Sequence, residues 1–294
     1  RSTANDTASA ADAAIASAPE AFSQGFSIDE AATFVEQATT RLVLGVGDIA
    51  ERAAGLRGGV GPALRALESS LDALPANITS LLRSPFQLGR AVVDLVQIVA
   101  SLDTGGRRTQ MRSLELMVDW EPAEVEFPVR TPQRLLEAAN RTAILQLVRV
   151  TAAAELARAA VALDFTTYED AISVRDSVSD RLDALALAAA DRGDDAAALT
   201  FDGLRRSLAR DISLRGSNLA RLYTVRLSAS EPALVLAHRL YGGDRAQSAD
   251  RVTSLEARSA SLVARNAVAH PSFLPAGEEL SLLTSGPDVR GLAA

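Results

Sequence analysis

The stretch "TPQRLLEAANRTAILQLVRVTAAAELARAAV", residues 131–161, decides the fold class of this 294-residue chain. The spacing of its apolar residues predicts one buried face on a helix of roughly eight turns. Thr131 can cap this helix, and Pro132 suits its first turn. We expect such a long helix with small side chains to pack along a partner helix or a neighbouring subunit. The predicted face consists of Leu136, Ala139, Ala143, Leu147, Val150, Ala154, Ala157 and Val161.

Composition narrows the class of protein further. Hydrophobic residues make up 48% and aromatic residues only 4%, which favours a folded chain of closely packed helices. The net charge of −7 makes the chain a poor non-specific ligand for DNA or an anionic membrane. The absence of Cys excludes disulfides, thiol catalysis and Cys-ligated metal sites. No apolar run predicts a membrane-spanning helix. Because the chain has no initiator Met, we expect it to be part of a longer or processed protein.

Residues 27–215 are predicted to form a helical domain of long antiparallel hairpins. Residues 1–26, which are small and polar, are expected to be a linker or flexible arm. Ser27 and Glu30 fit a capping box for a helix to about residue 54, and Pro62 suits the start of another to about residue 74. Pro85 is expected to kink or divide the segment that follows. A buried stripe is predicted at Leu88, Val92, Leu95, Val99 and Leu102.

The second half of this domain adds a connection and a further hairpin. Residues 118–132 hold three prolines and the only Trp, so we expect an extended connection. Trp120 is interpreted as a packing anchor, with ligand stacking as the alternative. Thr167 and Asp170 offer a second capping site, for a helix that ends near Gly193. Another helix is expected at about residues 196–210.

From about residue 216 the sequence predicts strands as well as helices. The alternating "LYTVRL" (222–227) is typical of a short strand. "EPALVLAHRLYGG" (231–243) and "VTSLEARSASLVARN" (252–266) indicate two helices, and "HPSFLPAGEELSLL" (270–283) a turn and a closing strand. The predicted order is therefore strand, helix, helix, strand.

No motif in the chain predicts an enzyme, a cofactor or a metal. The glycines at 45 and 47 lie within a helical pattern, so they do not indicate a phosphate-binding loop. His238 and His270 lack the spacing of metal ligands, which favours roles in packing or in a turn. No G-x-S-x-G motif supports a serine nucleophile. An acid–base catalytic site made of two carboxylates that are distant in the sequence and close in space stays open as an alternative.

The C-terminal residues resemble a LysM module. The matching residues are Tyr223 and Val225 in the first strand, Leu240, Tyr241 and Gly242 at the end of the first helix, then Asn266, Pro275 and Gly277. The resemblance implies two helices on a two-stranded antiparallel sheet, and binding of glycans that contain N-acetylglucosamine. Residues 228–231 depart from the family's turn, and about two dozen residues separate Tyr241 from Asn266. Both departures fall near where the glycan would lie.

A second resemblance covers more of the chain. "PALVLAHRLYGG" (232–243) with "LVARNAVAHPSFLPAGEELSLL" (262–283) resembles the C-terminal end of the DNA circularisation proteins of Mu-like contractile-tailed phages. The Ala-rich helices before it are in character for that family. The resemblance implies a virion protein of the tail and baseplate. The match is carried by Arg265, Asn266, His270, Pro271, Phe273 and Pro275.

Together these features predict a mainly α protein of long antiparallel helical hairpins followed by a small βααβ LysM-like domain. The domain is expected at residues 216–286, with a tail at 287–294. We expect a non-enzymatic structural protein of a contractile phage tail, at the baseplate hub or inner baseplate, assembled in the bacterial host cytoplasm. Its expected partners are tail tube and hub proteins and copies of itself; neither a membrane nor direct nucleic acid binding is expected. The alternatives are a peptidoglycan-binding module that aids cell-wall contact and a DNA-end-binding protein.

Overall fold

The computed structural model describes residues 3–27, 33–55, 62–102, 106–122, 131–217, 219–241 and 248–284. The fold is mainly helical, as predicted, with one small two-stranded sheet. None of the helices in these ranges is both long and apolar enough to cross a membrane. The tail expected at 287–294 lies outside the described residues.

The chain divides into two compact units. The helical unit comprises Arg1–Asp164 and Val174–Ser213, and the C-terminal unit comprises Phe165–Ser173 and Leu214–Ala294. The second break lies close to the boundary expected at residue 216. No feature of the sequence indicated that residues 165–173 would group with the C-terminal unit.

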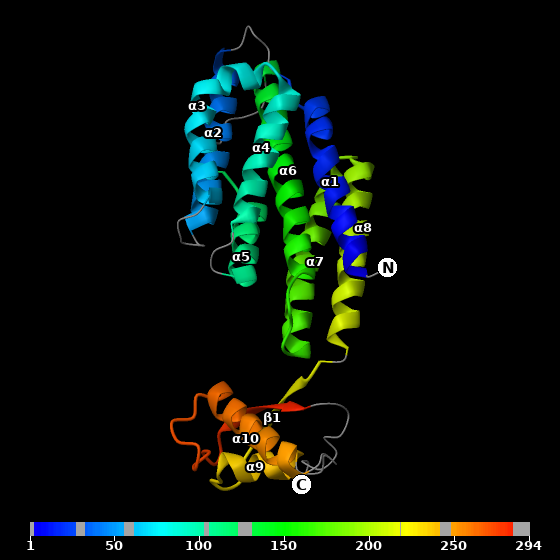
Figure 1. Cartoon of the computed structure of the whole chain (residues 1–294). Helices are drawn as coiled ribbons and strands as arrows, with labels where there is room; N and C mark the ends of the chain where they lie inside the picture. The colour runs from blue at the N-terminus through cyan, green and yellow to red at the C-terminus, as the bar shows by residue number, and fades with distance from the viewer. Residues whose placement is uncertain are drawn as a thin grey trace. The chain divides into compact units, whose positions relative to one another are not determined.

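Helix α6 (Pro132–Val161) lies at the centre of the helical unit and packs against α4 (Pro85–Ser101) and α1 (Thr3–Gly25), which also contact each other (Figure 1). The Thr131 hydroxyl accepts a hydrogen bond from the Arg134 amide at 3.3 Å, so the predicted N-cap is confirmed. The single buried stripe is wrong in part, since Ala139 is exposed. From residue 151 to 161 every side chain except that of Arg158 is buried. The reason is that small alanines let neighbouring helices approach this half of α6 from several sides.

Helix α1 overturns the linker or flexible arm expected at residues 1–26. It packs along α6 and α4, with Ala11, Ile15 and Phe22 among its buried residues. A Cβ added to Gly89 of α4 would lie 3.2 Å from the Pro19 Cα, so the two helices approach closely there. The small, polar composition was misread because alanines spaced three or four residues apart provide both helix propensity and a narrow buried face.

Helices α2 (Thr33–Gly55) and α3 (Pro62–Leu82) follow α1, but α3 continues past the end predicted near residue 74. The capping box predicted at Ser27 and Glu30 lies largely outside the described residues. The Ser27 backbone is instead held by the buried Asn140 side chain. Asn140 Oδ1 accepts from the Ser27 amide at 3.2 Å, and Asn140 Nδ2 donates to the Ser27 carbonyl at 2.8 Å.

Helix α4 confirms the predicted stripe, because all five of its residues are buried. Pro85 divides the segment by starting α4 three residues after α3 ends at Leu82. Helix α5 (Gly106–Val118) was not predicted. Beyond it, the Trp120 ring lies against α2, where a Cβ on Gly45 would be 3.3 Å from Trp120 Cζ2. This contact bears out the packing role expected of Trp120.

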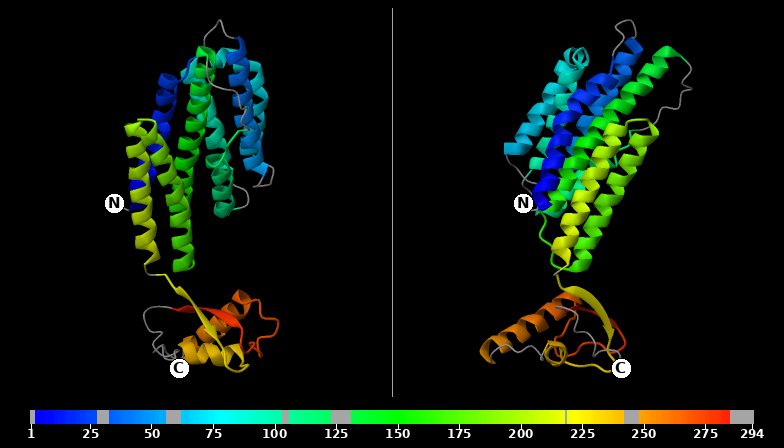
Figure 2. Two further views of the ribbon diagram at one scale, coloured as in Figure 1. Left: turned by 180° about the vertical axis from the view of Figure 1, so that it is seen from behind. Right: turned by 90° about the vertical axis from the view of Figure 1, so that its right-hand side faces the viewer.

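Helices α7 (Tyr168–Asp191) and α8 (Asp195–Gly216) form the predicted hairpin, and both views in Figure 2 show them side by side. The Thr167 hydroxyl accepts from the Asp170 amide at 3.1 Å, which confirms the second predicted cap. Between the helices, Arg175 Nη1 donates to Ser213 Oγ at 3.2 Å. Helix α8 extends beyond the end expected near residue 210.

The C-terminal unit contains β1 (Arg221–Arg226), α9 (Ala233–Tyr241), α10 (Ser248–Arg265) and β2 (Glu279–Thr284). The strands pair antiparallel, with Tyr223 opposite Leu282. The start of α7 also belongs to this unit, because the Tyr168 amide donates to the Ala220 carbonyl at 2.9 Å. The core is apolar and comprises Leu227, Ala233, Leu236, Leu262, Leu274, Leu280 and Leu282.

Candidate functional site

The outer edge of β2, the one that faces away from β1, is closed by the side chain of Asn266. Asn266 Oδ1 accepts from the Ser281 amide at 2.7 Å, and Nδ2 donates to the Ser281 carbonyl at 3.0 Å and to the Leu262 carbonyl at 2.9 Å. An exposed strand edge offers unpaired amides and carbonyls to other chains. Asn266 satisfies both peptide groups of Ser281 and ties β2 to the end of α10.

The turn that follows α10 sets the position of Asn266. Ala267 has a φ of 48°, in the left-handed region, and follows the last residues of the helix. The Val268 amide donates to the Val263 carbonyl at 3.1 Å, and the Ala267 amide to the Ala264 carbonyl at 3.3 Å. These are the two bonds of a Schellman motif, which ends a helix abruptly. The chain thus leaves α10 directly beside β2.

Tyr241 binds the carbonyl at the next outward position of the same edge, that of Leu283. Its hydroxyl donates to the Leu283 carbonyl, and the Arg258 guanidinium lies 4.5 Å from the centroid of its ring. Burial raises the pKa of the Tyr241 phenol, while the positive charges of Arg258 and Arg265 act in the opposite direction. A raised pKa keeps the phenol protonated, so the hydroxyl remains a donor.

Two connections of the C-terminal unit, residues 227–232 after β1 and 266–278 before β2, are joined by backbone hydrogen bonds. The Leu274 amide donates to the Glu231 carbonyl at 2.9 Å, and the Gly277 amide donates to the Leu227 carbonyl at 2.8 Å. Leu274 is completely buried between them. Gly277 has a φ of 78°, which favours glycine, so the Pro275-to-Gly277 stretch makes the predicted turn into β2.

His270 and Phe273 lie on the surface of this connection. The His270 Nδ1 accepts from the Ser272 amide at 3.3 Å, which fits the turn role expected of this histidine. The His270 and Phe273 ring centroids are 5.5 Å apart, and Phe273 is 67% exposed. The Pro271 carbonyl accepts from the Ala233 amide at 2.8 Å, so this turn is fixed to the start of α9.

The remaining residues of the sequence match do not gather with these. Val225 and Leu240 pack against the apolar core, and Pro275 is partly buried in the connection. Tyr223 is exposed on β1. Gly242 lies outside the described residues. The structure therefore brings Asn266 and Tyr241 to one strand edge. Val225 and Leu240 support the core, and Tyr223 takes part in neither.

Sequence reasoning missed a pocket of about 290 Å³ between α10 and β2. One wall is a face of α10, where Arg258, Ser261 and Arg265 follow at spacings of three and four residues. The other wall includes Leu282 and Leu283 of β2. The helical spacing was visible in the sequence. The neighbouring strand that turns this face into a pocket was not.

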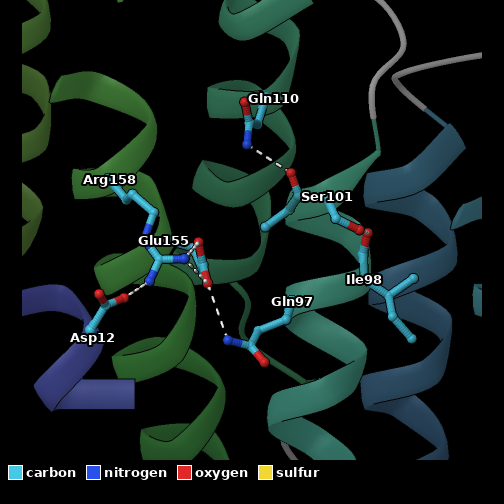
Figure 3. Close-up of polar contacts among 8 residues, drawn as sticks. Asp12, Gln97, Ile98, Ser101, Gln110, Glu155 and Arg158 are labelled. Carbon is cyan, nitrogen blue, oxygen red and sulfur yellow. Dashed lines mark hydrogen bonds and ion pairs between the residues drawn. The ribbon is translucent and has the colours of Figure 1, made fainter. Parts of the chain in front are cut away.

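A separate polar cluster lies inside the helical unit, around Glu155 of α6 (Figure 3). Arg158 Nη1 lies 3.2 Å from both Glu155 carboxylate oxygens, and its Nη2 pairs with Asp12 of α1. Gln97 Nε2 of α4 donates to Glu155 Oε1 at 3.4 Å. Burial raises the pKa of the Glu155 carboxyl, against a smaller lowering by Gln97. The contacts join α1, α4 and α6, so we interpret the cluster as one that stabilises the packing of these three helices.

The structure and the comparisons assign no catalytic centre. Within the described ranges, no three carboxylate or imidazole side chains come together where they could hold a metal ion. No protein-family model matches the sequence, and no curated protein is significantly similar to it. The candidate sites therefore rest on their own geometry.

Proposed function

We propose that this chain is a structural virion protein of a contractile phage tail, at the baseplate hub or inner baseplate. It works by assembly with tail tube and hub proteins and with copies of itself. Its C-terminal unit is a LysM-like βααβ domain within that protein. The proposal comes from the sequence resemblance carried by the residues at 232–243 and 262–283.

The observation that carries this proposal is the placement of Asn266 and Tyr241. Both belong to the matched motifs, they lie far apart in the sequence, and each bonds a neighbouring outward peptide position of β2. A motif residue with a defined structural task is better support for the resemblance than a match in composition. The antiparallel order of strand, helix, helix and strand agrees with it.

The helical unit supplies surfaces suited to assembly. Leu187 of α7 and Leu199 of α8 are 64% and 68% exposed, close to the turn of their hairpin. Large exposed apolar side chains of this kind are typical of protein contacts when they cluster. Leu135, near the start of α6, is exposed as well.

A fractionation of tail particles tests the proposal. Contractile tails purified from a producing bacterium should carry the chain, and immunogold labelling should place it at the baseplate end. A matched pair of variants sharpens the test: Leu187→Ser with Leu199→Ser should reduce incorporation, whereas Arg112→Gln, also on the surface, should not. If the wild-type chain is absent from intact particles and remains a monomer, the proposal fails.

Peptidoglycan binding is the second candidate, and Phe273 is the observation that favours it. An exposed aromatic ring beside His270 offers a face on which a sugar ring can stack. Purified cell-wall sacculi should then retain the chain, and the Phe273→Ala variant should be retained less. If sacculi retain both proteins equally or neither, glycan binding by this surface is excluded.

A further inference from the structure

The outer edge of β1 is the one that faces away from β2, and the pairing of the sheet fixes which of its peptide groups point outward. Thr224 lies opposite Ser281, whose own amide and carbonyl point outward to Asn266. Residues directly opposite in an antiparallel ladder either bond each other or both point outward. The amide and carbonyl of Thr224 therefore point away from β2. By the same alternation, those of Leu222 and Arg226 do as well.

The start of α7 covers only the first half of this edge. The Tyr168 amide donates to the Ala220 carbonyl. The Glu169 carboxylate accepts from the Leu222 amide at 2.8 Å. Among the described residues, none bonds the outward peptide groups of Thr224, which is exposed. An edge with unpaired amides and carbonyls is a template for a further strand.

Tyr223 lies beside this open edge and is exposed on the core side of the sheet. It is opposite Leu282, which belongs to the buried core, so both side chains point to that side. The Tyr223 side chain is nevertheless 40% exposed, because β1 is the last strand of the described sheet in this direction. Val225 points to the same side and is partly buried. A further strand would cover the Tyr223 ring.

We propose that the open edge of β1 pairs antiparallel with β1 of a second copy of this chain, about a twofold axis at Thr224. The two Thr224 residues exchange two hydrogen bonds across the axis. Each Arg226 amide donates to the Leu222 carbonyl of the other copy, so the bond between Glu169 and the Leu222 amide is kept. The result is one sheet of four strands, two from each copy.

Charge and residue type make a second copy the fitting occupant. Pairing about Thr224 places Arg226 opposite Leu222, next to the Glu169 carboxylate of the other copy. It brings no cation of β1 opposite another. It also sets each Tyr223 opposite a Val225, and an aromatic with a β-branched side chain is a favourable cross-strand pair.

This contact names a surface for the proposed assembly with copies of the same chain, and it rests on that proposal. A single strand edge is a small interface, so we expect a reversible dimer at protein concentrations on the order of 0.1 mM.

Sedimentation equilibrium of the full chain tests the twofold pairing. Thr224→Lys and Thr224→Glu each place like charges directly opposite, so each should dimerise about fivefold more weakly than the wild type. An equal mixture of the two variants places opposite charges there and should dimerise again. Thr142→Lys, at an exposed threonine of α6, should leave the equilibrium unchanged. A monomeric wild type, or a mixture that dimerises no better than either variant alone, overturns the proposal.

Thr224→Pro tests the central hydrogen bonds directly. Because the Thr224 amide faces outward, proline removes it without breaking a bond between β1 and β2. Each dimer loses both central donors, which predicts about 30-fold weaker dimerisation. The near-UV circular dichroism of the tyrosines, measured on dilute protein, verifies that each variant is folded.

The outcomes for this contact and for the tail assignment can be told apart. If tail particles contain the chain but Thr224→Pro and both charged variants dimerise as the wild type does, the strand pairing fails and the tail assignment stands. If the variants behave as expected but the chain is absent from tail particles, the tail assignment fails and the strand pairing stands.

Discussion

Replacing Asn266 with Ala tests whether the closed edge of β2 stabilises the C-terminal unit. The change removes three hydrogen bonds, to the Ser281 amide, the Ser281 carbonyl and the Leu262 carbonyl. A neutral hydrogen bond contributes about 1 kcal/mol net. Because Asn266 is only partly buried, water can replace some of this loss. We therefore expect the free energy of unfolding to fall by about 2 kcal/mol.

The Asn266→Asp variant is the matched control, because it has almost the same shape. Its carboxylate can still accept from the Ser281 amide. The second oxygen, however, faces the carbonyls of Ser281 and Leu262, which are acceptors themselves. At neutral pH this variant should be at least as unstable as Asn266→Ala. These acceptors raise the folded pKa of the new carboxyl, so stability should recover as the pH falls and the carboxyl gains a proton.

Two sets of intrinsic probes allow each unit to be followed. All three tyrosines, Tyr168, Tyr223 and Tyr241, belong to the C-terminal unit, and the single tryptophan, Trp120, belongs to the helical unit. Urea unfolding should shift in the tyrosine circular dichroism of Asn266→Ala. Native-state hydrogen exchange of the Ser281 amide should accelerate by about 30-fold, the equivalent of 2 kcal/mol. If that amide exchanges at the wild-type rate and the tyrosine transition does not move, the reasoning is refuted.

Three further changes have defined outcomes. Burial raises the pKa of the Glu155 carboxyl above its ordinary value of 4.5. The protonated side chain therefore contributes its full stability below pH 4.5, and this contribution is lost as the pH rises through the pKa of the folded protein. Relative to Glu155→Gln, the wild type should therefore become less stable to urea as the pH rises above 4.5; a difference constant with pH would contradict this. Ala267→Gly removes the Cβ from a residue with a left-handed φ of 48°, so it should raise the free energy of unfolding by about 0.5–1 kcal/mol in chemical denaturation. A lower free energy of unfolding would show that Ala267 is not strained in this turn. Gly45→Ala places a Cβ 3.3 Å from Trp120 Cζ2, so the gain in helix propensity and the cost of overpacking should cancel within about 1 kcal/mol of unfolding free energy. The fluorescence emission of Trp120 should nevertheless shift. An unchanged emission spectrum would argue against the contact.

The helices that bury one face could be predicted from the sequence. In α4 the residues of the predicted stripe are large and apolar, so Leu88 and Val99 marked the buried face correctly. The buried face is wider than the stripe, because Val93 and Val96 are buried as well. In α6 the pattern could not show how many helices surround it. Alanines are compatible with burial on any side, and Ala139 is exposed while Ala153 is buried. The number of neighbours is a property of the whole fold.

For a related reason, the candidate site could be predicted only in part from the sequence. Asn266 and Tyr241 could be singled out as motif residues, but their partners are backbone atoms of Ser281 and Leu283. Backbone groups are the same at every position, so no residue pattern marks the ones that need a partner. The error at α1 has a different cause. Its composition resembles that of a linker, and its helix is stabilised by packing on α4 and α6.

The side chains bonded to the edges of the small sheet bear on how the C-terminal unit can associate with other proteins. A two-stranded sheet has two edges, and each invites strand addition. On β2, Asn266 binds the outward amide and carbonyl of Ser281, and Tyr241 binds the outward carbonyl of Leu283. On β1, the Leu222 amide donates to the Glu169 carboxylate at 2.8 Å. These four backbone groups already have partners within the unit, so a strand added by another protein could not bond to them without displacing those partners. At these positions, contacts through side chains are favoured over strand addition.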